Sequence, residues 1–333
     1  MTSHGTTRVG AVDRLLDLSI LGGFSRIGYD LRSRGRSWQD LDDIDMSGRT
    51  IAVTGATSGL GLATVTRLRT LGANVVLIGR QPSKLDDVVW RLVDRPAIGT
   101  VRSVVCDLGD LESVRRACGQ LSAMGPIDVL VHNAGALTKE RQVSPQGVES
   151  TVATDVLGPF VMTSLLADRI STSVITVASG GMYAAGLPDV VGGRSLEMST
   201  NSYDGTRQYA IAKRAQVTLN EMWAEARNEP RFYAMHPGWA DTPGVQESLP
   251  LFRTLTRPLL RTPDQGSDSI LWLASLDRNT TEVGSGSFVC DRRVRPIHRL
   301  ASTRRTDTRV NRESLWEWCV DHVQHYSSPL GER

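Results

Sequence analysis

Blocks of apolar residues separated by helical patterns run through residues 51 to 135 of the chain. The runs "IAVTGA", "NVVLIGR", "VRSVVCDL" and "IDVLVHNAG" are largely apolar, which is typical of strands buried on both faces of a sheet. Between these runs the apolar positions follow a helical period, as in "LGLATVTRLRTLG", which closes at Gly72. The pattern therefore predicts parallel strands joined by right-handed helical crossovers.

The alternation continues towards the C-terminus. Two helices are predicted at 148–168 and 206–227, and a third in "TPDQGSDSILWLASL", where Thr262 is the expected N-cap and Pro263 the first helical residue. Further strands are predicted in "SVITVAS", "RFYAMHPG" and "SGSFVC". We therefore expect an α/β fold with a Rossmann-type doubly wound parallel sheet, three αβα layers and a single domain over residues 48–290.

Residues 1–47 precede this domain and are predicted to form a helical extension followed by a charged linker. Within residues 11–31, apolar side chains recur at helical spacing at Val12, Leu15, Leu16, Leu18 and Leu21. Such a helix either packs on the outside of the domain or makes a peripheral contact with a membrane or a protein partner. Three acidic residues dilute the basic face that membrane-surface helices show, which favours packing: Asp13, Asp17 and Asp30.

Residues 291–333 follow the domain as a basic tail and a terminal helix. Eight arginines lie close together in the tail, namely Arg292, Arg293, Arg295, Arg299, Arg304, Arg305, Arg309 and Arg312. They form either a patch for nucleic acid or acidic membrane, or a solvated tail, and the lack of aromatic residues to stack bases favours the solvated tail. The next stretch, "SLWEWCVDHV", predicts an amphipathic helix with one apolar side made of Leu315, Trp316, Cys319 and Val323.

Composition narrows the class of protein. The chain has 333 residues, a formal net charge of +2 and 40% hydrophobic residues, which allows one large core and does not indicate nucleic-acid binding. The four cysteines have no C-x-x-C spacing, so the sequence predicts neither a metal site nor a disulfide framework and fits a cytoplasmic protein. No stretch approaches the ~20 apolar residues of a membrane span, and the first residues lack the layout of a signal peptide.

A glycine-rich stretch, "TGATSGLG" at 54–61, stands where the first strand ends and the first helix begins. Gly55, Gly59 and Gly61 permit a tight turn and let the backbone approach a pyrophosphate, while the helix N-terminus offers N–H groups to the anion. The alternative is a turn with only a packing role. The order strand, loop, helix favours nucleotide binding.

The ends of the next strands indicate which nucleotide is bound. An acidic residue at the end of the second strand is typical of NAD sites, but here that strand ends in Gly79 and Arg80. An arginine can pair with a 2′-phosphate, so NADP(H) is preferred and NAD(H) remains an alternative, unless Arg80 only faces solvent. Asp107, at the end of the third strand, is expected to accept a hydrogen bond from the adenine amino group. The expected floor of the cofactor cleft is Asn133, Ala134 and Gly135.

A second motif, "YAIAK" at 209–213, puts Tyr209 and Lys213 on one helical face, four residues apart. By itself this is weak, because exposed helix faces often carry such residues. Reducing a carbonyl requires a proton on its oxygen, and a free phenol titrates at about 10, too high for efficient transfer at neutral pH. A neighbouring cation favours the phenolate, which makes a tyrosine beside a lysine suitable for this proton transfer.

Further motifs complete a pattern, namely "HNAG" at 132–135, Ser179 in "TVASGG" and "HPGWADTP" at 236–243. With these, the chain resembles the classical short-chain dehydrogenase/reductase (SDR) family over residues 48–290. The segments "DGTRQYAIAKRAQ" and "MHPGWADTPGV", and "GYD" at 28–30, resemble the branch of that family called dehydrogenase/reductase family member 12. The G-x-x-x-G-x-G spacing argues against the extended branch of epimerases.

The resemblance implies a role for each residue of the expected site. Tyr209 is the general acid/base, Lys213 is its cationic neighbour and holds the nicotinamide ribose, and Ser179 hydrogen-bonds the substrate oxygen. Thr242 is expected to hold the nicotinamide carboxamide. The implied cofactor-binding set is Gly55, Thr57, Ser58, Gly59, Leu60, Gly61, Arg80, Asp107, Leu108, Asn133, Ala134, Gly135, Tyr209, Lys213, Pro237, Gly238 and Thr242.

Asp155, in "TVATDVLGPF", departs from the family pattern and is the fourth expected catalytic residue. The family has an asparagine there, which helps to anchor a water of the proton relay. Asp155 either does the same through its backbone carbonyl or holds the proton of Lys213 more tightly and slows the relay. His132 and Ala178 also differ from the common family residues, and His132 is expected to be structural.

The loops beyond the strand ends are expected to hold the substrate. Residues 180–205 form one wall, and residues 239–262 form a lid with apolar side chains at Trp239, Leu249, Leu251, Phe252, Leu255, Leu259 and Leu260. Such a lid suits a lipophilic carbonyl or alcohol of the retinoid, steroid or fatty aldehyde type, although the same residues would also cover a core. The sequence therefore predicts an NADP(H)-dependent oxidoreductase. The alternative is a nucleotide-binding protein of the same fold with little catalysis, acting as a redox sensor or interaction partner.

The resemblance also implies a homodimer or homotetramer, formed through the helices at 148–168 and 206–227. The apolar residues that fit either this contact or the core are Met162, Leu165, Leu166, Val217, Met222 and Trp223.

Overall fold

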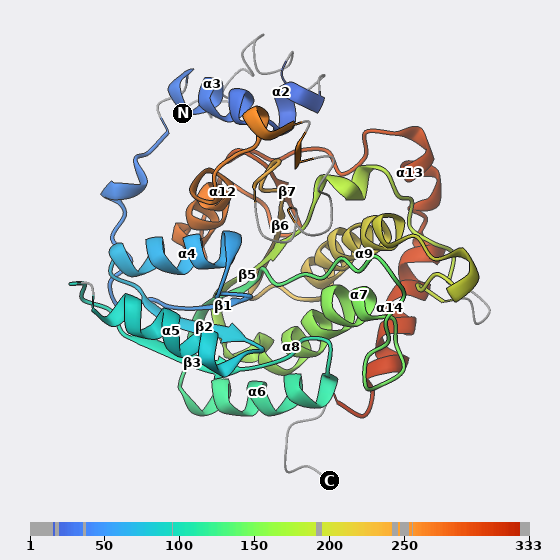
Figure 1. Ribbon diagram of the computed structural model, residues 1–333, viewed down its shortest axis with the longest axis horizontal. Helices are drawn as coiled ribbons and strands as arrows, with labels where there is room; N and C mark the ends of the chain where they lie inside the picture. The colour runs from blue at the N-terminus through green and yellow to red at the C-terminus, as the bar shows by residue number, and fades with distance from the viewer. Residues whose placement is uncertain are drawn as a thin grey trace, which may run out of the picture.

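The computed structural model describes residues 16, 20–35, 38–94, 96–190, 195–241, 246, 253–254 and 256–326. Parallel strands form one seven-stranded sheet in the order β3-β2-β1-β4-β5-β6-β7 (Figure 1). The strands are β1 (Thr50–Thr54), β2 (Asn74–Gly79), β3 (Val101–Val105), β4 (Ile127–His132), β5 (Ile170–Val177), β6 (Arg231–Met235) and β7 (Phe288–Val289). The predicted Rossmann-type sheet is confirmed.

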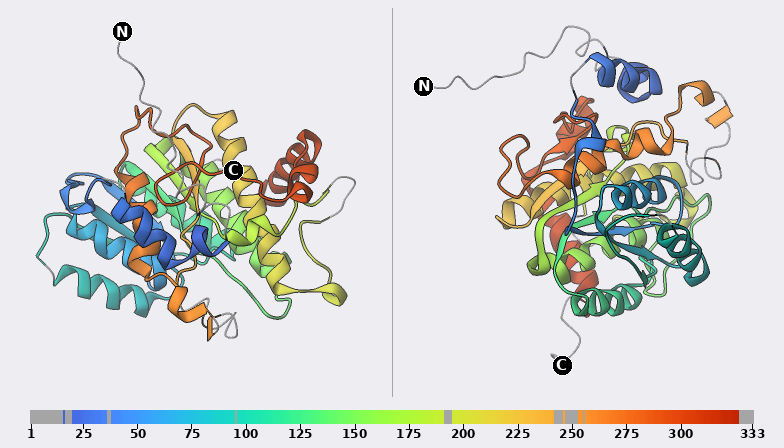
Figure 2. Two further views of the ribbon diagram at one scale, coloured as in Figure 1. Left: turned by 90° about the horizontal axis from the view of Figure 1, so that it is seen from above. Right: turned by 90° about the vertical axis from the view of Figure 1, so that its left-hand side faces the viewer.

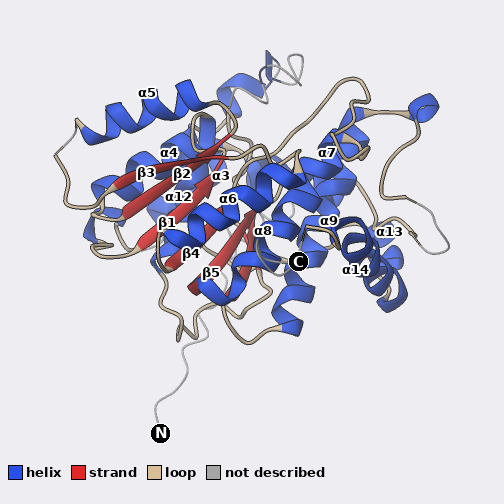
Figure 3. Ribbon diagram, turned by 90° about the horizontal axis from the view of Figure 1, so that it is seen from below, coloured by secondary structure: helices blue, strands red, loops and turns tan. Residues whose placement is uncertain are grey.

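Helices cover both faces of the sheet and complete the three layers (Figures 1 and 3). One face carries α4 (Gly59–Thr70), α5 (Pro82–Val93) and α12 (Pro263–Ser275), and the other carries α6 (Leu111–Ala123), α8 (Gly158–Leu166) and α9 (Gly205–Ala226). Shorter helical turns are η1 (Leu41–Asp43), α7 (Ser150–Val152), η2 (Ala153–Leu157), η3 (Ala167–Arg169), η4 (Gly180–Tyr183), η6 (Thr200–Ser202) and η7 (Arg257–Leu259). The predicted N-cap of α12 is confirmed, because Thr262 and Gln265 form a reciprocal capping box.

The strand order changes direction at β1, which pairs with β2 on one side and β4 on the other. At such a switch point the loops that leave the carboxyl ends of the strands diverge and open a crevice for ligands. The predicted glycine loop follows β1, the "NAG" residues follow β4 and Ser179 follows β5. The topology therefore brings motifs that lie more than a hundred residues apart to one edge of the sheet.

The terminal helix α14 (Arg309–Val323) packs against α8 and α9, as Figure 1 shows in red at the right. Its predicted apolar side is confirmed, because its residues Leu315, Cys319 and Val323 are at most 1% exposed. The ring of Trp316 meets Phe160 of α8 and Trp223 of α9, with ring centroids 5.1 and 4.7 Å apart. The helix thus covers aromatic surface of the two helices that the family resemblance implied for oligomer contacts.

The expected solvation of the basic tail is wrong for several of its arginines. Arg292 pairs with Asp268 at 2.7 Å, and Arg312 pairs with Glu221 at 2.8 Å. Arg295 is only 7% exposed and donates to a backbone carbonyl. The reason is that the chain turns back after β7 and runs along this strand, so its backbone and guanidinium groups find partners in the domain. The short helix α13 (Ala301–Thr306) follows.

The N-terminal helices α2 (Ile20–Phe24) and α3 (Arg26–Gly35) lie across the end of the molecule where α12 begins, drawn in blue in Figures 1 and 2. Tyr29 donates to Asp268 at 3.2 Å, and Gln265 donates to Asp30 at 3.0 Å. Within residues 20–31, the predicted packing on the domain is confirmed. The earlier apolar positions 12, 15 and 18 lie outside the described residues.

One helical stretch, Ser150–Arg169, is long and apolar enough by composition to span a membrane, contrary to the expectation from the sequence. However, 78% of its apolar window is buried inside the domain. It is therefore a core helix of the fold, and within it Met162 and Leu166 contribute to the core beneath the sheet.

Candidate active site

The glycine loop between β1 and α4 has the geometry of a nucleotide cradle. Gly55 and Gly59 have positive φ angles of 66° and 52°, which glycine adopts at little cost. A Cβ on Gly61 would lie 2.2 Å from the carbonyl oxygen of Gly55, so a side chain there would displace the loop. The turn residues Thr57 and Ser58, followed by Leu60, complete the loop, and the first N–H groups of α4 have no intrahelical partners. The residues present therefore fit a dinucleotide.

The end of β4 is bonded directly to this loop. The Asn133 side-chain amide donates to the carbonyl oxygen of Thr54 at 2.8 Å, and the Thr54 hydroxyl accepts from the backbone N–H groups of Asn133 and Ala134 at 2.9 and 3.0 Å. Gly135 follows, and a Cβ there would lie 3.3 Å from the Lys213 amine. The predicted cleft floor thus connects the glycine loop to the lysine of the second motif.

The residues predicted to select the nucleotide lie at the ends of β2 and β3. Arg80 directly follows β2 and its side chain is exposed. Asp107 is exposed after β3, with one carboxylate oxygen accepting from the Gly109 N–H at 2.9 Å, and Leu108 is buried behind it. Both charged side chains are therefore accessible to a ligand that extends from the glycine loop across these strands.

Ser179 and the "YAIAK" helix meet beyond β5. Ser179 begins η4, and its hydroxyl oxygen accepts from the Gly181 N–H at 3.2 Å. A Cβ on Gly181 would lie 3.7 Å both from the Ser179 hydroxyl and from Ala210, the residue after Tyr209. The Lys213 amine lies 5.2 Å from the centre of the Tyr209 ring. The structure therefore brings the predicted serine, tyrosine and lysine together.

Lys213 forms a buried ion pair with Asp155. The two side chains are 3% and 0% exposed, and the amine lies 3.0 Å from the carboxylate. The amine also donates to the carbonyl oxygen of Val177 at 3.3 Å. Burial favours a lower pKa for Lys213, but the charges of Asp155 and Tyr209 and the hydrogen bond to Asp155 outweigh it and raise the pKa above its ordinary value.

The backbone carbonyl of Asp155 has a partner that the sequence analysis missed. Gln216, one turn after Lys213 on α9, donates its side-chain amide to this carbonyl oxygen at 2.5 Å. Asp155 lies in the π-helical turn η2, and the carboxylate oxygen that does not face Lys213 accepts from the Ala136 N–H at 2.7 Å. In the expected route through this carbonyl, a water would therefore have to compete with the Gln216 amide for the oxygen. The sequence signal that could have indicated this contact is the position of Gln216, three residues after Lys213.

His132 lies behind this pair, as expected of a structural residue. It is 1% exposed, burial lowers its pKa to about 3, and Nε2 lies 2.9 Å from the Thr163 hydroxyl. Together with Asp155 and Gln216, it lines a small cavity of about 30 Å³. The imidazole is therefore neutral at physiological pH.

The segment after β6 carries the predicted nicotinamide contacts. Gly238 has a positive φ of 75°, and its N–H donates to His236 Nδ1 at 2.5 Å. Pro237 uses its carbonyl oxygen to accept from Arg261 at 3.3 Å. Thr242 lies outside the described residues, as do the predicted lid residues 249, 251, 252 and 255. Leu260, in contrast, is 6% exposed and covers the core.

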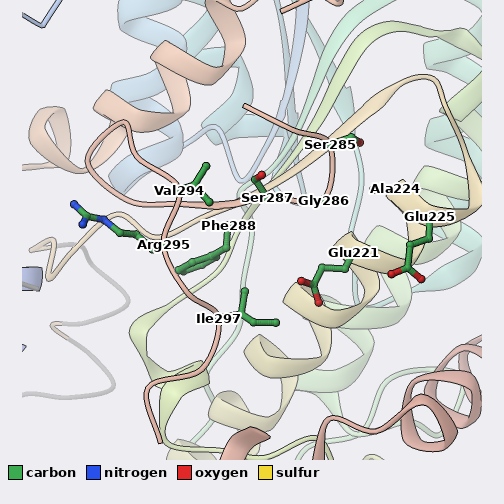
Figure 4. A pocket seen from close by; sticks show the side chains of 10 residues that line it. All are labelled: Glu221, Ala224, Glu225, Ser285, Gly286, Ser287, Phe288, Val294, Arg295 and Ile297. Atoms are coloured by element: carbon green, nitrogen blue, oxygen red, sulfur yellow. The ribbon is translucent and has the colours of Figure 1, made fainter. Parts of the chain in front are cut away.

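A larger cavity of about 440 Å³ lies elsewhere (Figure 4). Glu221 and Glu225 of α9 line one side, and Phe288 and Val294 line another. It begins about three helical turns beyond Tyr209 on α9 and contains none of the predicted catalytic or cofactor-binding residues. The candidate active site is therefore the crevice at the strand ends.

Comparisons with known proteins agree with this arrangement. The family model for short chain dehydrogenases matches residues 49–188. The chain is 33% identical to dehydrogenase/reductase SDR family member 12 of Bos taurus, over 88% of this chain and 92% of that protein. It is 26% identical to the polyprenol dehydrogenase of Homo sapiens, over 75% of this chain and 79% of that protein.

Among solved structures, the chain resembles a 3-oxoacyl (acyl-carrier-protein) reductase of Agrobacterium tumefaciens with NADP bound. The TM-score is 0.59 and the identity 19%, over 76% of this chain and 96% of that one, which supports the fold. The family is established by the sequence matches. This chain therefore belongs to the short-chain dehydrogenase/reductase family, as an oxidoreductase that acts on CH–OH or carbonyl groups with a nicotinamide cofactor.

Proposed function

We propose that the chain is an NADP(H)-dependent reductase or dehydrogenase for a lipophilic carbonyl or alcohol, with Tyr209 as general acid/base. The observation that carries this proposal is the convergence of Ser179, Tyr209 and Lys213 at the strand ends, beside a glycine loop that fits a dinucleotide. When bound, the nicotinamide cofactor supplies or accepts the hydride. Ser179 orients the substrate oxygen, and Tyr209 donates or takes up its proton. Lys213 holds the nicotinamide ribose and provides positive charge beside Tyr209.

The preference for NADP(H) rests on Arg80. The residue is exposed at the end of β2, where an NAD site would carry a carboxylate, and a guanidinium there pairs with a 2′-phosphate. The solved relative with bound NADP supports the use of this cofactor in the fold.

The proposal of a lipophilic substrate is supported by fewer contacts. Trp239 is half-buried at the start of the predicted lid and contacts the aromatic ring of Phe24. The relative named polyprenol dehydrogenase supports a long-chain lipid alcohol or aldehyde as the class to test first. Cytoplasmic localisation, peripheral membrane contact through residues 11–31 and a homodimer or homotetramer are proposed alongside this function.

The alternative, a redox sensor with little catalysis, is favoured by one observation. The carboxylate of Asp155 neutralises Lys213 in a buried pair, which opposes the proton relay that a free cation would serve. A sensor of this kind binds the dinucleotide but turns over no substrate.

The experiment combines fluorescence titration with NADPH and NADH and turnover of lipophilic aldehydes, ketones and alcohols, including polyprenol-type substrates. We expect tighter binding of NADPH and turnover that disappears in Tyr209→Phe, with cofactor affinity retained. Tyr233→Phe is the matched control, because it removes one phenol oxygen from a buried tyrosine of β6 that bonds the Val283 carbonyl. Tight binding without turnover across the panel would favour the sensor.

A further inference from the structure

The N-terminal helices touch the same segment that carries the predicted nicotinamide contacts. The Phe24 ring lies parallel to the His236 imidazole, with centroids 4.5 Å apart and planes 9° apart. The Phe24 carbonyl accepts the backbone N–H of Trp239 at 2.8 Å. Phe24 itself is 6% exposed, so these contacts are part of the packed interior. The extension therefore borders the residues on both sides of Pro237 and Gly238.

Arg261 connects the extension to this segment from beneath. Its side chain is 1% exposed and donates to the carbonyl oxygens of Ser25 and Pro237, each at 3.3 Å. A Cβ on Gly238 would lie 2.2 Å from Arg261 Nε, so the guanidinium lies directly against the Gly238 backbone. The Arg261 N–H also donates to the carbonyl of Trp239 at 2.7 Å. The position of Arg261 thus determines where the Pro237–Gly238 turn lies.

Arg261 is in turn held by a buried carboxylate that it shares with the extension. Asp291 accepts from Arg261 at 2.6 and 3.0 Å and from Arg32 of α3 at 2.5 Å. The three side chains are each at most 2% exposed. Burial favours a higher pKa for Asp291, but Arg261 and Arg32 outweigh it and hold the pKa below its ordinary value. Asp291 is therefore charged, and two cations from distant segments are fixed on it.

We propose that residues 22–32 are a positioning clamp for the nicotinamide end of the cofactor cleft. Phe24 holds the His236–Trp239 segment from the side. Arg32, acting through Asp291, fixes Arg261 beneath Pro237 and Gly238. The extension is then a component of the active site and not only an attachment to the domain.

The physical reason is preorganisation. Gly238 has a positive φ, and because glycine adopts positive and negative φ about equally readily, the surrounding contacts must select this conformation. The Gly238 N–H donates to His236, which stacks on Phe24, and the Pro237 carbonyl accepts from Arg261, so these contacts hold the turn. Without the clamp, this segment would become ordered only when the ligand binds, and that ordering reduces affinity. The effect falls on the nicotinamide end alone, because among the described residues neither the glycine loop nor Arg80 forms a hydrogen bond or ion pair with the extension or with Arg261.

This inference rests on the proposed cofactor, and a comparison of two ligands distinguishes failure of the clamp from failure of the proposed function. NADPH and 2′-phospho-ADP-ribose share the phosphorylated adenosine and the pyrophosphate, but only NADPH carries a nicotinamide. In the wild type both should bind. If neither binds, the proposed function is wrong, whereas if only the clamp is wrong, both ligands bind the wild type and the variants show no selective loss of NADPH affinity.

The variants are Arg32→Gln, Arg32→Lys and the control Arg26→Gln. Arg26 lies on the same helix, and its side chain is 54% exposed and pairs with Asp30, four residues on, at 3.7 Å. We expect Arg32→Gln to weaken NADPH about tenfold while 2′-phospho-ADP-ribose changes by less than about twofold. Arg32→Lys should recover part of the loss, and Arg26→Gln should match the wild type.

If Arg32→Gln does not fold, Phe24→Leu serves in its place, with the exposed Ile27→Ala as its control. The same selective loss of NADPH affinity is expected. Equal losses for both ligands would mean that the extension only stabilises the domain, and unchanged NADPH affinity would mean that the segment is held without it. Either result overturns the proposed clamp.

Discussion

Replacing Asp155 by asparagine tests whether the buried pair with Lys213 is charged. The two groups lie 3.0 Å apart with at most 3% of either side chain exposed. Asparagine preserves the volume and the oxygen that accepts from the Ala136 N–H, so it removes the charge with little change in packing. The variant therefore leaves the lysine amine buried beside a neutral amide.

The magnitude follows from the geometry. At 3.0 Å and an effective dielectric constant of about 20, Coulomb's law gives an attraction of about 5.5 kcal/mol. Removing one partner of a buried pair typically costs about 3–5 kcal/mol, because the remaining charge is uncompensated. The lysine can instead lose its proton, which at pH 7 costs about 4.6 kcal/mol from an ordinary pKa of about 10.4. We therefore expect the free energy of unfolding at pH 7 to fall by about 3–5 kcal/mol.

The stability difference between wild type and variant should depend on pH, in a direction set by the pKa values of the pair. Asp155 raises the pKa of Lys213 in the folded protein, so on the alkaline side this contribution persists up to the unfolded pKa of about 10.4 and is lost as the pH rises through the folded pKa. Burial outweighs Lys213 and raises the pKa of Asp155, so the pair also loses its charge when the pH falls through the pKa of this carboxyl. The difference between wild type and variant should therefore be largest near neutral pH and decrease in alkaline solution.

The assay is urea unfolding of wild type and variant, once near neutral pH and once in alkaline solution, with tryptophan fluorescence as the signal. The matched control is Asp168→Asn, which makes the same change at a carboxylate 85% exposed and paired with Arg227 on the surface. An exposed pair contributes at most about 1 kcal/mol. A loss in Asp155→Asn no larger than in the control, or a difference that does not decrease at high pH, would refute the charged pair.

Three further predictions follow from the cleft and its surroundings. Gly61→Ala should weaken NADPH at least about tenfold in a fluorescence titration, because its Cβ would lie 2.2 Å from the Gly55 carbonyl oxygen; unchanged affinity would show that the loop shifts freely. Arg80→Asp should weaken NADPH relative to NADH, and an equal loss of both would mean that Arg80 is not the selector. Truncation after Asp307 should expose Trp223 and promote self-association, measured by sedimentation; a truncated chain that keeps the wild-type mass distribution would contradict this.

The fold was predictable from the sequence because its signals are local. Buried strands, helical periods and the capping residue Thr262 each depend on neighbours within a few positions. The site residues at the ends of β1, β4 and β5 were also predictable, because parallel topology places all these ends at one edge. Tyr209 and Lys213 needed only helical spacing to be placed on one face.

The ion-pair network was not predictable, because its partners are distant in sequence. Arg32 and Asp291 lie 259 positions apart, and Arg261 and Asp291 lie 30 apart. Nothing in the local pattern distinguishes Arg32 from the exposed Arg26 on the same helix. The arginine-rich tail was misread for the same reason, since charge patterns indicate solvation unless the tertiary partners are known.

Asp155 also has a kinetic consequence that completes the test of the buried pair. With the carboxylate 3.0 Å from the amine, Lys213 acts on the proposed acid/base Tyr209 as one end of a dipole, whose field weakens faster with distance than that of a free cation. Such a pair suits reduction, in which the tyrosine must hold a proton to donate. Asparagine at position 155 leaves the positive charge less compensated and favours the phenolate. We therefore expect the pH profile for alcohol oxidation to move to lower pH in Asp155→Asn, and an unchanged profile would mean that the pair does not act on the proton transfer.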